Sequence, residues 1–426
     1  MQPIADQRET LVEHRDIYRQ AYNHFLYRLN QHDGIPEMRT LRDELTSLKK
    51  WWNDLSDVYS RALQKVVERL YDNLVSLKEL KANGYNVGSL NWKPPREYRS
   101  FTYTQSGFKL DKKSGQTMLH LSKIGDIPLV YHREVPDGAV PKEVHVKQEP
   151  TGEWFASVVV NDDGRPPEKP DDPERCVGID VGILKYTHDT DGMAVESLDL
   201  SEEQERLEHE QRVLSRKEHG SNNYREQQRK VARRHADITR KRHDFLHKLS
   251  TWYAREYDLV AVEKLDAKGL MELPSNSHNR ASAAWATFRN LLKWKCKREG
   301  THFAEVRPSG TTKECAQCGV ETEKPLWVRE HSCPACGFEA DRDANAAWNV
   351  LQRGFEKLEI GMGSAESTSS ETLRVSDGLR KSSSDFRTPS ETAVPTDTSF
   401  QQVSANRVIE QGSPTLKRSP RCVGER

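Results

Sequence analysis

Apolar side chains recur three and four positions apart through residues 9–82, as in YRQAYNHFLYRL and YSRALQKVVERLYDNL. That period places them along one stripe of a helix surface, which a globular protein buries. Within this stretch proline occurs only at Pro36, in the polar segment HDGIPE, where it fits a connection between helices. Residues 1–90 are therefore predicted to form a small helical bundle.

The pattern changes after the segment NGYNVGSLNWKPPREYRS. Short β-branched runs follow, such as SFTYTQSGFKL, EVHVKQEP and EWFASVVV, and each is bounded by Gly, Pro or Asp. Such runs are typical of strands in an antiparallel sheet or barrel. We expect a β-rich, barrel-like region over residues 91–172, ended by the polar linker NDDGRPPEKPDDPE.

Strands and then alternating helices and strands are predicted beyond the linker. RCVGIDVGILKYTHDTDGMAVESLDL indicates a strand, a tight turn, a second strand, an Asp-Gly hairpin and a third strand. Two long helices follow between residues 201 and 256, then the buried strand YDLVAVEKL, a helix near 281–299, the strand THFAEVRP and a helix over 342–357. This order predicts an α/β domain with a mixed sheet. Residues 359–426 are rich in Ser, Thr and Pro and are expected to form a disordered tail.

The composition of the chain indicates where the protein is located but does not identify a binding partner. The 426 residues carry 65 basic and 65 acidic side chains, so the net charge is zero. The chain has no run of eighteen apolar residues and no signal-peptide pattern at its start, which favours a cytoplasmic protein without a membrane partner. Four of the seven cysteines form two Cys-x-x-Cys pairs, a pattern that favours a metal site over disulfides.

The paired cysteines are Cys315, Cys318, Cys333 and Cys336, with a glycine directly after each pair. Two such knuckles can present four thiolates as a tetrahedron, which is the ligand set of one structural Zn²⁺ ion. Because four thiolates leave no open coordination position, this zinc is expected to be structural and not catalytic. The alternative is four ordinary thiols.

Three acidic residues end or begin predicted elements. Asp180 ends one apolar strand, Glu263 ends another, and Asp343 begins a helix with Asp341 just outside it. A carboxylate at the end of a buried strand is costly without a compensating positive charge. If the three meet at one sheet edge, they form a site for two Mg²⁺ ions and for phosphodiester cleavage. Taken singly, each has another reading: a turn at Asp180, a solvated strand end at Glu263 and a helix cap at Asp343.

Positive charge is concentrated in YREQQRKVARRHADITRKRHDFLHK, residues 224–248, which holds nine Lys or Arg against three acids. The excess is not offset by acids four residues further along. We interpret this helix as a phosphate-binding surface, with a solvated helix face as the alternative. The candidate contacts are Arg229, Lys230, Arg233, Arg234, Arg240 and Lys241.

The segments GIDVGI, VAVEKL and DRDANAAWNVL occur in that order, with the four cysteines between the last two. In this the chain resembles the TnpB family, transposon-encoded RNA-guided DNA endonucleases related to type V CRISPR effectors, over most of residues 9–358. The resemblance implies a RuvC-like nuclease on a ribonuclease H fold. That nuclease would be formed by residues 173–311 and 341–358 and split by a zinc ribbon at 312–340. It also implies that Asp180, Glu263 and Asp343 are the catalytic, magnesium-binding residues.

The same resemblance implies the partners. The helical (REC-like) and barrel-like (wedge) regions would grip a guide RNA and read a short motif beside the DNA target, which is bound in double- and single-stranded form. Family members open with a strand that leads into Pro-x-x-x-Gln. This chain opens at MQPIADQRETL, so that strand is expected to be missing.

Roles can also be predicted for two residues near the third acid, Asp341 and Asn345. Asp341 is expected to serve the start of the helix and not to bind metal. Asn345 is a candidate for orienting the Asp343 carboxylate, with a solvated position on the helix as the alternative.

Two other classes of function remain open at this point. One is a catalytically silent RNA- or DNA-binding regulator on the same scaffold. The other is a guide-free, structure-specific nuclease of the Holliday-junction type. A strand-transferring transposase fits less well, because its usual acid spacing does not place a ribbon before the third acid.

Overall fold

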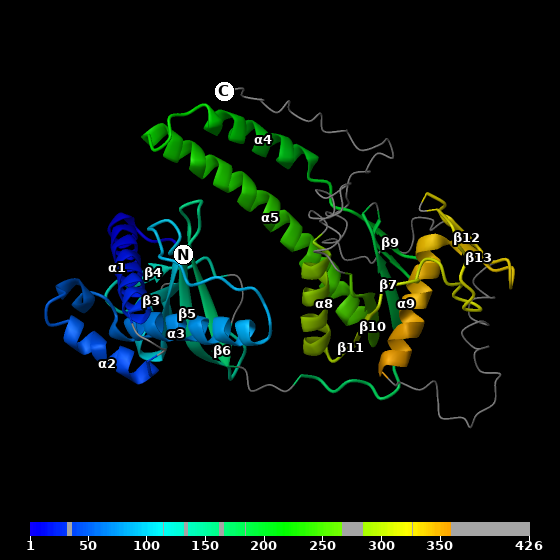
Figure 1. Cartoon of the computed structure of the whole chain (residues 1–426), viewed down its shortest axis with the longest axis horizontal. Coiled ribbons are helices and arrows are strands. Elements are labelled where there is room, and N and C mark those ends of the chain that lie inside the picture. The colour runs from blue at the N-terminus through cyan, green and yellow to red at the C-terminus, as the bar shows by residue number, and fades with distance from the viewer. Residues whose placement is uncertain are drawn as a thin grey trace. The chain divides into compact units, whose positions relative to one another are not determined.

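The computed structural model describes residues 1–31, 36–113, 115–131, 135–161, 166–183, 185–265, 284–325 and 327–358. The chain forms two compact units (Figure 1). The first contains residues 1–164 and 209–234, and the second contains residues 165–208 and the chain from 235 onward. The predicted tail at 359–426 and the start of the predicted helix at 281–299 lie outside the described residues.

Helices open the first unit, as the apolar spacing predicted. They are α1 (Ala5–Asn30), α2 (Met38–Leu48) and α3 (Ser60–Ala82), with a 3-10 turn at Asn53–Ser56. Leu11, Tyr18 and Phe25 are spaced seven residues apart on α1 and are fully buried. The predicted period therefore corresponds to the core-facing stripe of the helix.

The β-rich part of the first unit consists of two three-stranded antiparallel sheets. One has the order β1-β5-β6 and the other the order β2-β3-β4. The strands are β1 (Ser100–Thr104), β2 (Phe108–Lys113), β3 (Gln116–Leu121), β4 (Gly125–Pro128), β5 (Val140–Gln148) and β6 (Trp154–Asn161).

The helices and strands of the first unit share one hydrophobic core, although the sequence suggested two separate regions. The ring of Tyr18 on α1 lies 5.0 Å from that of Phe101 on β1. The rings of Tyr59 and Tyr103 stack at 5.2 Å. Contacts of this kind fix the helices on the sheet.

The first element among the described residues is α1, which begins at Ala5. The first residues are nevertheless held by backbone hydrogen bonds. The Gln2 N–H donates to the Pro128 carbonyl at 2.8 Å, and the Met1 amino group donates to the Trp154 carbonyl at 3.1 Å.

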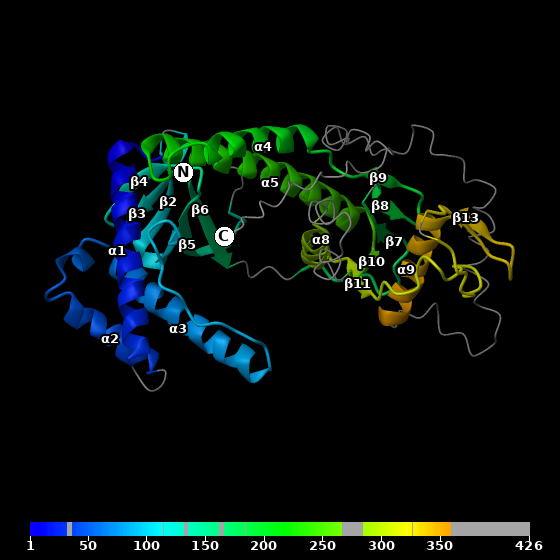
Figure 2. The same cartoon turned by 45° about the horizontal axis from the view of Figure 1, so that its top comes forward.

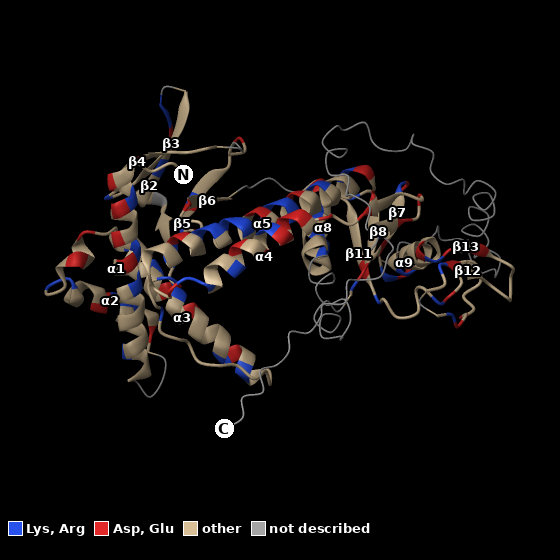
Figure 3. Ribbon diagram, turned by 90° about the horizontal axis from the view of Figure 1, so that it is seen from above, with Lys and Arg blue, Asp and Glu red and all other residues tan. Residues whose placement is uncertain are grey.

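The two predicted long helices are α4 (Ser201–Ser215) and α5 (Asn222–Glu256), and they form an antiparallel hairpin. The Gln227 amide on α5 donates to the Glu210 carbonyl on α4 at 3.1 Å. Figure 3 shows acidic positions in red along α4 and basic positions in blue along α5. The α4 sequence holds five glutamates against two arginines, which is charge-complementary to α5.

A five-stranded mixed sheet with the order β11-β10-β7-β8-β9 organises the second unit. Its strands are β7 (Cys176–Val181), β8 (Lys185–Asp189), β9 (Ala194–Glu196), β10 (Leu259–Glu263) and β11 (His302–Val306). The strands β7, β10 and β11 run parallel, and β8 and β9 are antiparallel to their neighbours. The prediction of a mixed sheet is confirmed.

Helices cover both faces of this sheet (Figure 1). Val177 and Ile179 of β7 pack in one core with α5 and with α8 (Trp285–Glu299). On the opposite face, Ala261 of β10 packs in a core with α9 (Arg342–Leu358). Because side chains alternate along a strand, Gly178 and Asp180 of β7 lie on the α9 face.

A small hairpin of β12 (Glu330–Ser332) and β13 (Glu339–Asp341) leads directly into α9 (Figure 2). None of the described helices is long and apolar enough to cross a membrane.

Candidate active site and metal centre

Asp180 and Glu263 occupy neighbouring positions at the ends of two parallel strands. In the register of β7 and β10, Ile179 lies opposite Val262, so the next residues along are Asp180 and Glu263. Adjacent positions in a parallel pair project to the same face of a sheet. Both acids therefore project from the face that α9 covers.

The helix α9 packs closely enough on the sheet to bring Asp343 to the same place. A Cβ added at Gly178 would lie 2.1 Å from the Ala347 carbonyl oxygen, and one at Gly354 would lie 2.6 Å from the Ala261 Cβ. Asp343 precedes Ala347 by one helical turn and lies on the same side of α9. The two glycines thus allow the backbone contact that places Asp343 beside Asp180.

Glu263 and Asp343 both act on the ionisation of Asp180. Burial raises the pKa of Asp180 well above its usual value, and Glu263 and Asp343 raise it further, while Arg342 opposes the shift. Burial raises the pKa of Glu263 to about 7, against the opposing effects of the Thr311 hydrogen bond and Arg353. Burial disfavours the charged form of both carboxyl groups, and at Asp180 the two neighbouring acids add to this effect.

The alternative roles that the sequence allowed for Glu263 and Asp343 do not agree with the structure. Glu263 is only 6% exposed, so it is not a solvated strand end. Asp343 does not cap its helix. That role belongs to Asp341, whose Oδ1 accepts the N–H groups of Asp343 at 2.8 Å and Ala344 at 3.4 Å. The expectation that Asp341 serves the helix start is confirmed.

Two arginines contact the Asp343 carboxylate. Arg342 donates to its Oδ1 at 3.2 Å, and Arg329 lies 3.7 Å from its Oδ2. These contacts orient the Asp343 carboxylate at the start of α9.

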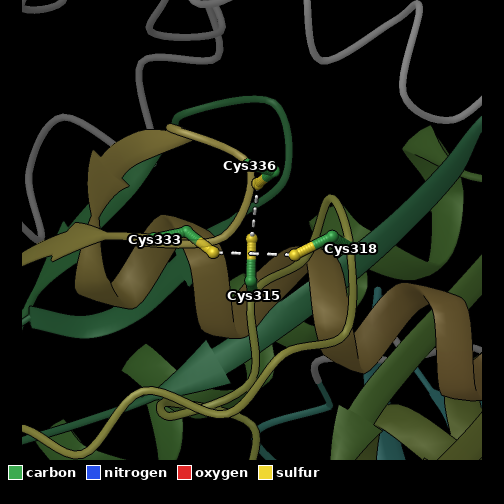
Figure 4. A group of neighbouring side chains, drawn as sticks. All are labelled: Cys315, Cys318, Cys333 and Cys336. Atoms are coloured by element: carbon green, nitrogen blue, oxygen red, sulfur yellow. Dashed lines mark hydrogen bonds between the residues drawn. The ribbon is translucent and has the colours of Figure 1, made fainter.

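The four predicted zinc ligands converge. All four Sγ atoms lie within 4.8 Å of one another, with 3.7 Å between Cys315 and Cys336 and 3.5 Å between Cys318 and Cys333 (Figure 4). Within the described ranges this is the only set of three or more His, Cys, Asp or Glu side chains gathered so tightly, and the three acids do not form one. The cluster fits a tetrahedral Zn²⁺ ion.

Each cysteine knuckle closes through the glycine that follows it. The Gly319 N–H donates to the Cys315 carbonyl at 2.8 Å, and the Gly337 N–H donates to the Cys333 carbonyl at 2.9 Å. Both glycines have positive φ angles, 72° and 74°, which other residues adopt only at a cost.

The ribbon is bonded to α9 through two buried asparagines. The side-chain Oδ1 of Asn345 accepts the Ala316 backbone N–H at 2.9 Å, and its side-chain Nδ2 donates to the Glu314 backbone carbonyl at 2.7 Å. The Asn349 amide donates to the carbonyls of Thr311 and Glu314, each at 2.8 Å. Both expectations for Asn345 were wrong: it neither orients the Asp343 carboxylate nor faces solvent, but anchors the loop that enters the first knuckle.

The second knuckle is joined to α9 along the backbone. It lies between β12 and β13, and Glu330 pairs with Asp341, the residue that caps α9. The Arg342 N–H donates to the Arg329 carbonyl at 2.7 Å. Metal at the cysteines would therefore fix both the loop and the first turn of the helix that carries Asp343.

The loop also reaches the second acid, through a residue that the sequence did not single out. The Thr311 hydroxyl, on a residue that is 2% exposed, donates to Glu263 Oε1 at 2.5 Å. A Ser or Thr a few residues after a buried strand is too common to mark such a contact in advance.

The predicted basic surface on α5 is partly neutralised. Arg229, Lys230, Arg233, Arg240 and Lys241 are exposed. However, Lys241 forms an ion pair with Glu203, and Arg234 lies 4.0 Å from Glu210. The prediction that acids four residues along do not offset the charge was wrong at Lys248, which pairs with Asp244 at 2.9 Å, and acids on α4 offset further charge.

Two family models match the chain. OrfB_IS605, described as a "probable transposase", matches residues 145–273, and the Cas12f1-like TNB domain matches residues 285–350. The second match covers the ribbon and the first half of α9.

Curated relatives extend the likeness. A Streptomyces pristinaespiralis protein, provisionally named an RNA-guided DNA endonuclease, is 37% identical over 268 residues. That match covers 62% of this chain and 65% of the relative, so the chain spans slightly less than two thirds of its length. The Escherichia coli protein InsQ, with the same provisional name, is 29% identical, covering 72% of this chain and 77% of InsQ.

The fold resembles that of a solved protein. In a Cas12f1–sgRNA–target DNA complex, the protein superposes with a TM-score of 0.54 at 14% identity, covering 82% of this chain and 83% of that one. At this identity the likeness establishes a shared fold only.

Proposed function

The chain is a member of the TnpB family, and we propose that it is an RNA-guided, metal-dependent DNA endonuclease encoded by a mobile element. The relatives at 37% and 29% identity carry that activity in their provisional names. The observation that carries the proposal is that Asp180 and Glu263 project from the sheet face covered by α9, and that Glu263 and Asp343 of α9 both raise the pKa of Asp180.

The proposal assigns the second unit to a RuvC-like nuclease on a ribonuclease H fold. Two features support this assignment: a mixed five-stranded sheet with acids at the ends of adjacent parallel strands, and a third acid supplied by a helix across the sheet. The four-cysteine ribbon interrupts the nuclease directly before that helix. We also keep the sequence-derived segments at 173–311, 312–340 and 341–358 as the proposed domain limits.

Divalent cations fit the acidic site because Asp180 and Glu263 form no ion pair with any residue that the structure describes, whereas Asp343 is contacted by Arg342 and Arg329. Asp180 and Glu263 are shifted toward the neutral form, so they would ionise together only with added positive charge nearby. Carboxylate oxygens are the ligands that Mg²⁺ prefers. Two bound Mg²⁺ ions would supply an activated water and stabilise the leaving oxygen of a phosphodiester.

Each residue of the proposed site has a separate role. Asp180 and Glu263, on neighbouring strands, would hold the cations, and the Thr311 hydroxyl keeps one Glu263 oxygen turned toward the ribbon loop. Asp343 would complete the site from α9, where Arg342 and Arg329 contact its carboxylate. The zinc ribbon positions Asp343 and takes no part in the chemistry, since its cysteines leave no open position.

Guide RNA and DNA are the proposed partners. Exposed Arg229, Lys230 and Arg233 on α5 support a contact with phosphates, because they have no ion pair with any described residue. Base pairing with the guide would supply sequence specificity, and the protein would hold the backbone of the duplex.

The experiment that tests this function starts from the RNA that co-purifies with the protein. That RNA is sequenced, and plasmids bearing the matching target beside a randomised flank are incubated with the complex and Mg²⁺. Cleavage that requires the RNA and the match supports the proposal. Binding without cleavage favours a silent regulator, and cleavage after RNA removal favours a guide-free, structure-specific nuclease.

A further inference from the structure

His188 lies directly beside the first acid of the proposed site. It is on β8, and in the antiparallel pair of β7 and β8 its position is opposite Asp180. Residues directly opposite in such a pair project to the same face, with Cβ atoms about 5 Å apart. His188 therefore projects from the α9 face together with Asp180 and Glu263.

The imidazole is enclosed there and one of its nitrogens lacks a partner. His188 is 7% exposed, and its Nδ1 is fully buried without a hydrogen bond to any part of the chain that the structure describes. A buried nitrogen without a partner has lost its hydrogen bond to water and gained none in return, which is unfavourable. Native proteins usually meet that cost with an ordered water or an ion.

The charged groups around the imidazole come from two directions. Asp343 and Asp341, at the start of α9, act on it electrostatically, and Lys185 of β8 opposes them. Burial is the largest influence and disfavours the charged ring. A neutral imidazole keeps one nitrogen lone pair free, and a lone pair among carboxylates is suited to a cation.

We propose that His188 is a fourth member of the acidic site and gives a nitrogen ligand to a divalent cation held there with Asp180 and Asp343. This rests on the proposed function, since the cation is the one that the nuclease would use. Mg²⁺ binds almost wholly through oxygen, whereas manganese and later first-row metals lie higher in affinity for nitrogen ligands. The site accordingly takes Mn²⁺ more tightly than an all-oxygen version of itself would.

The test measures Mn²⁺ binding to the zinc-loaded full chain without any DNA. Pulsed electron paramagnetic resonance detects ¹⁴N nuclei bound to Mn²⁺, and ¹⁵N-histidine labelling identifies the nitrogen as imidazole. We expect a histidine signal from the wild type and none from His188→Ala. The affinity of the variant for Mn²⁺ should fall by about 10-fold or more, with a smaller change for Mg²⁺.

Two further variants make the outcome decisive. His188→Asn keeps a polar side chain of similar reach, so a folded His188→Asn protein that lacks the nitrogen signal supports the proposal even if His188→Ala fails to fold. Asp180→Asn should lose Mn²⁺ at the site altogether. A wild type that binds Mn²⁺ in an Asp180-dependent way but without a histidine signal overturns the role of His188 alone. Mn²⁺ binding that survives Asp180→Asn overturns the acidic site itself.

Discussion

Gly178 on β7 lies against the backbone of Ala347 on α9, so closely that an added Cβ would be 2.1 Å from the Ala347 carbonyl oxygen. This contact fixes the distance between α9 and the sheet. Since Asp180 follows Gly178 by two residues and Asp343 precedes Ala347 by one turn, the same contact sets the separation of two of the three acids.

Gly178→Ala is expected to destabilise the second unit by about 3 kcal/mol, because neither backbone can move without breaking hydrogen bonds of the sheet or the helix. Cleavage should fall further than the loss of folded protein explains, since α9 carries Asp343 away from Asp180. Gly88→Ala is the matched control: its Cβ meets nothing within 4 Å. Thermal unfolding and cleavage rates check both. A Gly178→Ala protein as stable as Gly88→Ala would contradict the close contact.

Loss of zinc should inactivate the acidic site, although the zinc ligands are not part of that site. Cys315→Ser is expected to lose the metal and reduce cleavage by about 100-fold, because the loop and first turn that position Asp343 are no longer fixed. Cys176→Ser, at a cysteine outside the cluster, should keep one zinc ion per chain and near-normal activity. Elemental analysis and cleavage assays on the two proteins decide this. Full activity in a zinc-free Cys315→Ser protein would show that the ribbon does not position the acid.

The raised pKa of Glu263 predicts how stability depends on pH in the absence of magnesium. The group has an ordinary pKa of 4.5 and a folded-state pKa of about 7. The folded protein thus holds this proton more tightly than the unfolded chain does. The resulting contribution, roughly 3 kcal/mol, is fully present below pH 4.5 and is lost as pH rises through 7.

Unfolding of the zinc-loaded, magnesium-free protein is measured from pH 5 to pH 8 to check this. We expect the wild type to lose more stability over the range than Glu263→Gln, which cannot ionise there. Millimolar Mg²⁺ should restore the wild type at pH 8 and leave Glu263→Gln nearly unchanged. Identical pH profiles for the two proteins would refute the shift at Glu263.

Charge on α5 should be divided between RNA binding and pairing with α4. Replacing exposed Arg229 and Arg233 by Gln is expected to lower the slope of log K against log salt for RNA binding by about 1.4, as two phosphate contacts to single-stranded RNA are lost. The control replaces Arg234 and Lys241, which already interact with Glu210 and Glu203. That pair should change the slope much less. Equal effects from both pairs would mean that the unpaired arginines have no special role.

The sequence predicted correctly those features that depend only on residues close together in the chain. The spacing of Cys315, Cys318, Cys333 and Cys336 specifies a four-thiol cluster because each knuckle is a single turn. The strand-end positions of Asp180 and Glu263 followed from the apolar runs before them. Their proximity depended on strand order, which a single sequence suggests only through resemblance to a family.

Long-range contacts were beyond the sequence. Asn345 serves backbone groups of a loop about thirty residues earlier, and Glu210 and Glu203 reach α5 from a separate helix. Nothing in a helical segment shows which distant groups its polar residues will meet. His188 was missed for the same reason, since a lone histidine in a strand gains meaning only from the residue opposite it.

The most direct test of the account compares DNA cleavage by the wild type, Asp180→Asn and Asp341→Asn, each loaded with the same guide RNA in Mg²⁺. Asp180→Asn is expected to cut at least about 1000-fold more slowly while it keeps its RNA, because a cation ligand is lost and the basic surface is not. Asp341→Asn should cut nearly as fast as the wild type, since an asparagine can cap α9 equally well. Wild-type cleavage by Asp180→Asn would contradict the central claim that Asp180, Glu263 and Asp343 form the nuclease site.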